Sequence, residues 1–552
     1  MPHWVRAALA GFLAVTLTAC ARKGGCTGDY CGTLVFASVG EPETLLPPVV
    51  QSSSARDVSD QLFLKLADLG MLTNTIGDED FTPLLADRWD WDDPLTLAFH
   101  IDPRARWHDG EPVTAADVVF TYDAYMDQRV GSPYRTSLKW ISAVTLRDSL
   151  TAIFRFRRRY PEMFYDAVYH MRVLPGHLLR NVPRDQWQTA AFGRAPIGDG
   201  PYRFKSWKAG ESLELTADSS FFLGRPHIPR LIWRFTPDLQ VAVTQLVAGE
   251  ADALEVLVSP DNIQRVKGAP QLATYPYKGS GYGYLGFNLA ANGDSTKPHP
   301  LFGDRSIRRA LAMATDRPRL LKSVFGDNAK VPPGSMSQLL WIWDPEIREL
   351  PYDTAQAGRL LSARGWIDSD GDGVRDHDGA KLTFRLLVPT SSAVRRGYAR
   401  LVQEELRKIG VEVQIDEVEF SVFLQRAQAG QFDALIQVWN TDPTPSSGIT
   451  QTWTQGGIGQ SNYLRYASPS FDHLVEQAST TFDRKAAQRD WRAAMELINQ
   501  DAPAIFLFAV QNVAAVHRRV ENVTIRPDSW WALVRTWRIP PDKLIDRDRV
   551  ER

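Results

Sequence analysis

Residues 435–445 place a Trp and an Asp three positions apart at the end of a predicted strand. In "LIQVWNTDPTP" an apolar run carries the chain into the protein, and Pro443 and Pro445 then turn it outward. Asp442 therefore follows Trp439 at the point where a strand meets a loop, a common position for a binding site. The local sequence alone favours a simpler role, in which the Asp442 carboxylate caps the turn through its own backbone.

A second group of carboxylates occurs in "DSDGDGVRDHDG", residues 368–379. Its Asp residues occupy positions 1, 3, 5 and 9 of an EF-hand-like calcium loop, with Gly at position 6: Asp368, Asp370, Asp372 and Asp376. The Glu expected at position 12 is missing, and the following "KLTFRLLVP" is typical of a strand rather than a helix. A solvated turn is the favoured interpretation, and a structural calcium site is the alternative. No other cofactor is predicted.

The N-terminal segment has the pattern of an export signal. Arg6 precedes an apolar run over residues 7–19, which is too short for a permanent membrane span. "LTAC" resembles the lipobox of bacterial lipoproteins, which implies cleavage before Cys20 and acylation of that Cys by lipid chains such as palmitate. More than one chain is needed for stable anchoring. The alternative is an ordinary secretory signal cut after Ala19, and both interpretations export the protein.

The remaining cysteines, Cys26 and Cys31, lie close together in "CTGDYC". An even number of cysteines in an exported chain favours a small disulfide. A two-Cys zinc site is the weaker alternative, because no His lies near enough in the sequence to complete it.

Composition excludes several classes of protein. The 63 basic and 65 acidic residues nearly cancel and form no long block, so neither nucleic acid nor an anionic membrane surface is an expected partner. The 17 Trp and 16 Tyr suit large cores or a cleft that grips organic ligands. The nucleophile-elbow, zinc-protease and phosphate-loop motifs are absent from the sequence, and the ten His are scattered, so an enzyme is not predicted.

The order of predicted elements indicates a mixed α/β protein rather than a run of βαβ units. Hairpins are predicted around Asp109-Gly110 and in "GDGPYRFKSWKAGESLELTAD", with a helix beginning at Thr114 in a capping box with Asp117. Helices are interspersed with strands from Leu301 to about Pro503. The closing segment "WWALVRTWRI" has strand-like composition.

Several phrases, in this order, resemble family 5 of the bacterial extracellular solute-binding proteins, the dipeptide and oligopeptide binders of ABC importers. The most specific is "FHIDPRARWHDGEPVTAADVVFTYD", supported by "FTPLLADRW", "GYLGFNLA" and "DRSIRRALAMATDRPRLL". "PIGDGPYRF" departs from the family turn by placing Asp199 where Thr is usual. The resemblance extends from about Gly32 to Ile539.

This resemblance implies a two-lobed, periplasmic-binding-protein type II-like α/β fold with an inserted domain and mixed sheets flanked by helices. The implied division is a signal peptide at 1–19, a lipid-anchored tether at 20–31, a discontinuous domain I at 32–65, 198–283 and 508–545, an inserted domain II at 66–197, and domain III at 284–507. Closure of the lobes on a ligand would be a hinge motion.

The resemblance also reverses the local interpretation of Asp442. Peptide-binding members carry Trp-x-x-Asp at this strand end, and the Asp faces the peptide α-ammonium; Trp439 and Asp442 match it. Tyr134 in "SPYRTSL" is implied to line the cleft, and Ser53 and Ser54 to contact ligand, with a turn Tyr and a solvated loop as alternatives.

The implied function is that of a monomeric, lipid-anchored peptide-binding protein outside the cytoplasmic membrane, which delivers its ligand to a separate permease and ATPase. Nickel, haem, a sugar, an opine or an antibiotic are alternative ligands, and an envelope receptor or chaperone is an alternative role.

Overall fold

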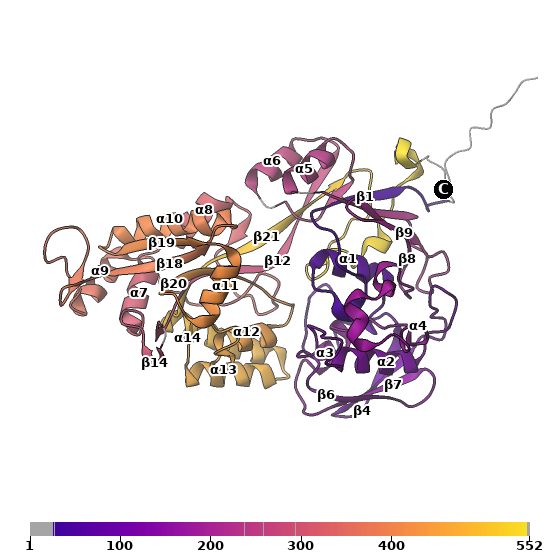
Figure 1. Ribbon diagram of the computed structural model, residues 1–552, viewed down its shortest axis with the longest axis horizontal. Coiled ribbons are helices and arrows are strands. Elements are labelled where there is room, and N and C mark those ends of the chain that lie inside the picture. Colours follow the sequence, from indigo (N-terminus) through magenta and orange to yellow (C-terminus); the bar gives the residue numbers. More distant parts are fainter. Residues whose placement is uncertain (1–25, 27, 237, 258, 293, 549–552) are drawn as a thin grey trace, which may run out of the picture.

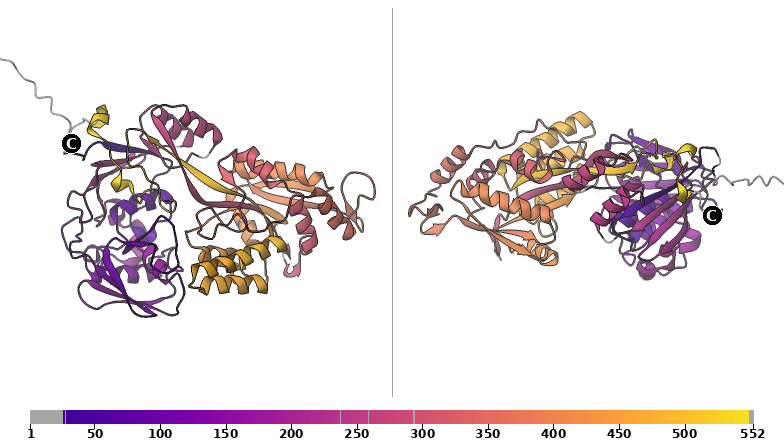
Figure 2. Two further views of the ribbon diagram at one scale, coloured as in Figure 1. Left: turned by 180° about the vertical axis from the view of Figure 1, so that it is seen from behind. Right: turned by 90° about the horizontal axis from the view of Figure 1, so that it is seen from above.

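The computed structural model describes residues 26 and 28–548, apart from residues 237, 258 and 293 (Figure 1). The predicted signal peptide and Cys20 lie outside the described residues. The described chain forms two lobes, joined by long strands that run from one to the other (Figures 1 and 2). Within this part of the chain, no helix has both the length and the apolar character needed to cross a membrane.

A mixed sheet of eleven strands continues through both lobes. Its path is β19-β18-β20-β12-β21-β11-β1-β10-β9-β8, with β15 paired to β21. The bounds are β1 (Thr33–Ser38), β8 (Tyr202–Lys208), β9 (Ser212–Ala217), β10 (Arg230–Phe235), β11 (Ala253–Leu254), β12 (Leu272–Phe287), β15 (Ala329–Lys330), β18 (Thr383–Pro389), β19 (Glu412–Val418), β20 (Ala434–Asn440) and β21 (Ala504–His517). β18 runs parallel to β19 and β20, whereas β12 is antiparallel to β20 and β21. The sheet is therefore mixed.

The strands β12 and β21 belong to both lobes. Their register shifts between Lys278 and Tyr282, where the sequence is rich in glycine. A Cβ atom on Gly279 would lie 2.6 Å from the carbonyl oxygen of Val510, so the close approach of the two strands requires glycine there. The expected domain boundaries at 283/284 and 507/508 fall within these strands.

Lobe 1 contains strand β1, which pairs with a neighbouring strand on each side, and the inserted segment 66–197. The insert carries an antiparallel sheet of order β4-β5-β7-β6. A capping box between Thr114 and Asp117 starts α2, as predicted. The bounds are β2 (Ala67–Leu69), β3 (Phe81–Pro83), β4 (Ala86–Asp93), β5 (Thr96–Ile101), β6 (Ile141–Leu146), β7 (Thr151–Phe156), α1 (Ser53–Leu62), α2 (Ala115–Met126), α3 (Met163–Tyr169), α4 (Gly176–Leu179), α5 (Leu239–Val247) and α6 (Pro260–Lys267). One hydrophobic cluster joins Phe36 of β1 to Phe99 and Phe154 of the insert, so the expected domains I and II share a core.

Lobe 2 packs helices on both faces of its part of the sheet. Strand alternation sends Leu285 of β12 into one cluster with Phe384 and Tyr398, and Tyr284 into another with Trp453. The bounds are α7 (Arg305–Met313), α8 (Arg317–Phe325), α9 (Thr354–Ala363), α10 (Ala393–Arg407), α11 (Phe420–Ala429), α12 (Pro445–Trp453), α13 (Pro469–Thr480) and α14 (Arg484–Asp501), with the short pairs β13 (Ala290–Ala291) and β14 (Asp294–Pro298), and β16 (Asp376–His377) and β17 (Ala380–Lys381).

The closing segment "WWALVRTWRI" is not a strand, and the expectation from its composition was wrong. It forms turns and a 3₁₀ helix, Val534–Thr536. Trp530, Trp531 and Trp537 are buried in the core of lobe 1. Because β1 already pairs with β10 on one side and β11 on the other, that strand offers no free edge here, and the aromatic side chains contribute to packing instead.

The described structure contains the Cys26–Cys31 disulfide. Cys31 is fully buried, and its N–H donates to the carbonyl oxygen of His227 at 3.1 Å. The bridge therefore closes a short loop at the start of lobe 1.

Candidate functional site

Trp439 and Asp442 lie at the end of β20, as the sequence predicts. Trp439 pairs with Tyr282 of β12 and is half-buried. The next turn is tied to β12, because Thr441 N–H donates to the Ser280 carbonyl oxygen at 3.0 Å. α12 then begins at Pro445. Asp442 is thereby held in a short connection between a strand of the sheet and a helix.

The Asp442 side chain is exposed and faces lobe 1. Burial raises the pKa of Tyr165 well above its usual range, and the charge of Asp442 is the next contribution. Tyr169 has a raised pKa from burial, Asp528 and then Asp442. Both tyrosines lie on α3, across from β20. Asp442 makes no hydrogen bond to another described residue, so its role as a backbone cap finds no support in the described part of the turn.

Arg56 of α1 is within electrostatic range of both Asp442 and the predicted Tyr134. Burial would lower its pKa, but Tyr134, Tyr169 and Asp442 outweigh this and hold the pKa above the usual value. Its Nε is buried and has no hydrogen-bond partner among the described residues. A buried donor without an acceptor costs free energy, so this atom is available to a ligand that brings an acceptor.

Tyr134 is half-buried and packs against Tyr125 and His170, with ring centroids 6.1 and 6.3 Å apart. Since Tyr134 and Asp442 both act on Arg56, the structure brings the predicted Tyr134 and Asp442 to the same cationic side chain. Side chains from three separate segments, those of Arg56, Tyr134 and Asp442, are therefore within electrostatic range of one another through Arg56.

Ser53 and Ser54 are not in a loop but in the first turn of α1. Ser52 caps the helix, because its Oγ accepts from Ala55 N–H at 3.1 Å. Ser53 and Ser54 line a cavity of about 250 Å³ together with Asp57 and Glu255. We call this cavity the acidic pocket; its walls also include Trp233 and Trp531.

Asp57 and Glu255 were not predicted as site residues from the sequence. Both are half-buried. Burial raises the pKa of Glu255 to about 7. Burial and then the charges of Glu255 and Asp60 raise the pKa of Asp57 well above its usual range. Asp57 comes from α1 and Glu255 follows β11, so no local spacing pairs them.

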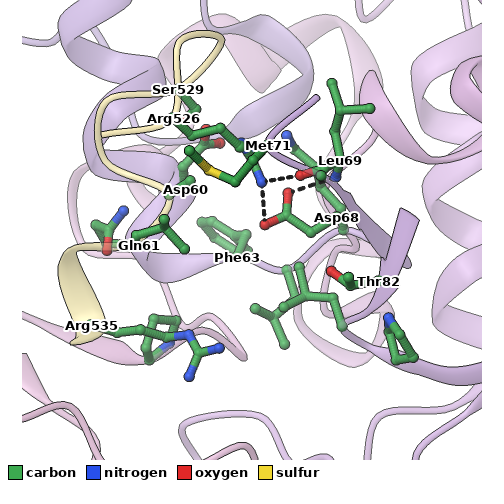
Figure 3. A pocket seen from close by; sticks show the side chains of 18 of the residues that line it. Asp60, Gln61, Phe63, Asp68, Leu69, Met71, Thr82, Arg526, Ser529 and Arg535 are labelled. Atoms are coloured by element: carbon green, nitrogen blue, oxygen red, sulfur yellow. Dashed lines mark hydrogen bonds and ion pairs between the residues drawn. The ribbon is translucent and has the colours of Figure 1, made fainter. Parts of the chain in front are cut away.

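A different cavity, of about 280 Å³, lies beside the start of the insert and is lined by a satisfied ion-pair network (Figure 3). Arg526 contacts Asp68 at 2.7 Å and Asp528 at 2.7 Å. Burial, with Arg172 next, lowers the pKa of the nearby Lys65 to about 8, and its Nζ lies 4.4 Å from the centre of the Tyr169 ring. The Arg526 charge is already paired, so this cluster joins the insert to the C-terminal segment.

The two lobes also touch through polar groups of the insert. Thr75 Oγ1 donates to Glu162 at 2.9 Å and accepts from Trp341 Nε1 of lobe 2 at 3.2 Å. Burial raises the pKa of Glu162 to about 7, while the Thr444 and Ser446 hydroxyls of lobe 2 lower it. Glu162 thus lies at a contact between the lobes.

A family model for bacterial extracellular solute-binding proteins, family 5, matches residues 80–461. The chain belongs to this family. Oligopeptide-binding protein AppA of Bacillus subtilis is 28% identical over 545 residues, covering 94% of this chain and 96% of AppA. Heme-binding protein A of Haemophilus influenzae is 23% identical over 526 residues, covering 90% of each chain.

Solved structures confirm the predicted two-lobed α/β fold. B. subtilis AppA in complex with a nonapeptide has a TM-score of 0.74 and 26% identity, covering 93% of this chain and 100% of that one. The substrate-binding protein CtaP of Listeria monocytogenes has a TM-score of 0.79 at 21% identity, covering 92% and 99%. As a family 5 protein, the chain is a member of a family of extracellular solute binders.

The Asp-rich loop brings only part of the predicted set together. Carboxylate oxygens of Asp368, Asp370 and Asp376 lie within 4.8 Å of one another. Lys381 Nζ lies 2.7 Å from Asp370 and 2.9 Å from Asp372, so an ammonium group is already present among the carboxylates. Asp368 accepts backbone N–H groups of Gly371 and Gly373, which is typical of a turn. This arrangement favours the turn interpretation.

Proposed function

We propose that this family 5 protein binds peptides outside the cytoplasm and that Asp442 takes the peptide α-ammonium. The observation that carries the proposal is the exposed Asp442 carboxylate, held at the end of β20 and facing Arg56, Tyr165 and Tyr169 of lobe 1. Closure around a ligand removes water from its ammonium, and a charge-assisted hydrogen bond to Asp442 compensates for that loss.

Trp439 supports this role from the same strand. It is half-buried beside β12, where an indole ring can exclude water from a neighbouring ion pair. Because the ligand would contact both lobes, binding favours the closed form by hinge motion about β12 and β21.

Delivery to a permease and hydrolysis of ATP would belong to separate subunits of an ABC importer. In support, the relatives include an oligopeptide-binding protein. We further propose that the mature chain begins at an acylated Cys20. Replacement of Cys20 with Ser should release the protein from membranes into a soluble fraction, whereas unchanged detergent partitioning would contradict the lipid anchor.

The test of the proposed ligand is mass spectrometry of what copurifies with the protein exported by its native cell. Peptides should be recovered, and calorimetry with the recovered peptide should give saturable binding to the emptied protein. Recovery of a nickel chelate, haem or a sugar instead, with no peptide bound, would overturn the proposal.

A further inference from the structure

The acidic pocket holds two carboxyl groups and no basic side chain in its lining. Its cavity of about 250 Å³ is built from α1, the end of β1, the segment after β11 and the C-terminal segment. Among the described residues, no Lys or Arg forms an ion pair with Asp57 or Glu255. Two half-buried carboxyl groups that share a cavity repel each other unless a proton neutralises one of them.

The two carboxyl groups line the same cavity, and the charge of Glu255 acts on Asp57. Burial raises the pKa of both groups, that of Glu255 to about 7, so the pair keeps a proton near neutral pH that a ligand cation could replace. The charged and titratable groups that face Asp57 are Glu255, Asp60 and Arg56, with Tyr277 of β12 facing the pair from the sheet.

A buried N–H group also lines the pocket. Trp531 is only 4% exposed, and its Nε1 has no hydrogen bond of good geometry to a described residue. This N–H is nevertheless close enough to both carboxyl groups to lower the pKa of Asp57 and of Glu255. The pocket thus supplies a donor for the ionised pair, which is the state that a bound cation favours.

Aromatic rings complete the walls. The Trp233 and Trp531 rings have centroids 5.2 Å apart, and Phe36 lies 4.3 Å from Trp531. Such surfaces pack against the methylene stem of a Lys or Arg side chain and attract its charged end. An uncharged aliphatic side chain would gain the packing but leave the carboxyl pair without a counter-charge.

We propose that the acidic pocket binds a basic side chain, Lys or Arg, of the bound peptide. This assignment rests on the proposed function. Arg56 is adjacent to Asp57 on α1 and is within electrostatic range of Asp442, so α1 connects the two sites at which we propose that the peptide ammonium and a side chain bind. Uptake of the cation ionises the pair and releases its proton, so affinity for a basic peptide rises as pH rises through about 7.

The test is calorimetry of the full-length exported protein with alanine-based peptides that have a free N-terminus. Each peptide carries a single Lys, and its twin carries norleucine at the same position. The position of the Lys is varied along the peptide. At one of these positions, the Lys peptide should bind at least about tenfold more tightly at pH 8 than its norleucine twin, a difference of about 1.4 kcal/mol. Titrations in buffers of different ionisation enthalpy should show proton release only with Lys.

Variants then distinguish the contribution of the pocket to peptide affinity from that of the other ligand contacts. Asp57→Asn combined with Glu255→Gln should abolish the preference for Lys and keep norleucine affinity within about twofold. If that pair fails to fold, Glu255→Gln alone should reduce the preference. Glu250→Gln is the matched control, because Glu250 lies in lobe 1 with a 56% exposed side chain and should keep the preference.

The outcomes are distinguishable. Equal binding of every Lys and norleucine pair by the wild type would overturn this assignment while leaving the peptide function intact. Loss of both Lys and norleucine binding in the folded pocket variants would mean that the carboxyl pair supports the cleft structurally, and would also overturn it. Failure of all peptides to bind the wild type would overturn the proposed function itself.

Discussion

The two lobes hold their carboxylates in different ways. On lobe 2, Asp442 is a lone, exposed side chain in a short connection after β20. On lobe 1, Asp57 and Glu255 are half-buried and share an aromatic pocket. A solvated carboxylate costs no desolvation free energy until a ligand covers it, whereas the two carboxylates of a half-buried pair repel each other until a proton neutralises one of them. The first arrangement suits affinity gained on closure, and the second suits selectivity among side chains.

The largest expected effect concerns Asp442. Replacement with Asn should weaken binding of a free-amine peptide by hundreds-fold or more, because loss of one partner of an enclosed ion pair costs roughly 3–5 kcal/mol, at about 1.4 kcal/mol per factor of ten. Thermal stability of the ligand-free protein should hardly change, since the side chain is exposed. Calorimetry with a peptide and its N-acetylated twin measures the effect.

The acetylated twin also provides the control. Wild type should discriminate strongly against it, while Asp442→Asn should bind the two peptides with similar weak affinity. Equal affinity of the wild type for both peptides would mean that Asp442 does not bind the peptide α-ammonium. The acidic pocket would then be the remaining site that we propose to select peptides by charge.

The contact between the walls should depend on pH through Glu162. Its pKa in the folded protein is raised to about 7 from 4.5, chiefly by burial, so the folded state binds its proton more tightly than the unfolded state. The contribution of Glu162 to stability is therefore greatest below pH 4.5, falls as pH rises towards 7, and is constant above that. Each pKa unit corresponds to about 1.4 kcal/mol, so the melting temperature should fall by a few degrees over this window.

In Glu162→Gln the melting temperature should fall less over this pH range, because the variant cannot titrate at this position. Glu255 also has a raised pKa and contributes the same trend in both proteins, so the difference between wild type and variant isolates Glu162. Glu250→Gln should follow the wild-type curve. Parallel melting curves for wild type and Glu162→Gln between pH 5 and 8 would show that the carboxyl is not held between the lobes in solution.

Local patterns predicted features that depend on neighbours in the sequence better than they predicted the acidic pocket. The strand end at Trp439 and the capping box at Thr114 depend on neighbours in sequence, and both occur where expected. The acidic pocket depends on the sheet bringing Glu255 beside α1, which no spacing reveals. The segment containing Trp530 was misassigned because strands and buried turns have the same apolar composition, and only the pairing of β1 distinguishes them.

The Cys26–Cys31 disulfide should have a small effect, because it closes a short loop at the start of lobe 1. Replacing both cysteines with Ser should lower stability by less than the roughly 3 kcal/mol of a 15-residue loop, because the sequence separation is only 5. Peptide affinity should be unchanged. Thiol titration of protein taken from the native envelope checks the pairing, and free thiols at both positions would contradict it.

The smallest effect is expected from calcium. The side chains of Asp370 and Asp372 already contact Lys381 Nζ at 2.7 and 2.9 Å, and hydrogen bonds to both carboxylates raise the pKa of Lys381. A fixed ammonium group satisfies the charge that a calcium ion would otherwise balance. Addition of calcium or of a chelator should therefore change the melting temperature of the wild type by less than about 1 °C.

Lys381→Ala sharpens this test, because it removes the cation while keeping the four Asp side chains at the calcium-loop positions, Asp368, Asp370, Asp372 and Asp376. In this variant the carboxylates repel one another, so calcium should now raise the melting temperature, and Lys381→Arg should restore the insensitivity of the wild type. A calcium-dependent rise of several degrees in the wild type, lost in Asp370→Asn, would instead make the loop a metal site and Lys381 a neighbour that moves aside. Neither result bears on the proposed peptide site. The loop lies in lobe 2 between α9 and β18 and includes neither Asp442 nor a residue of the acidic pocket.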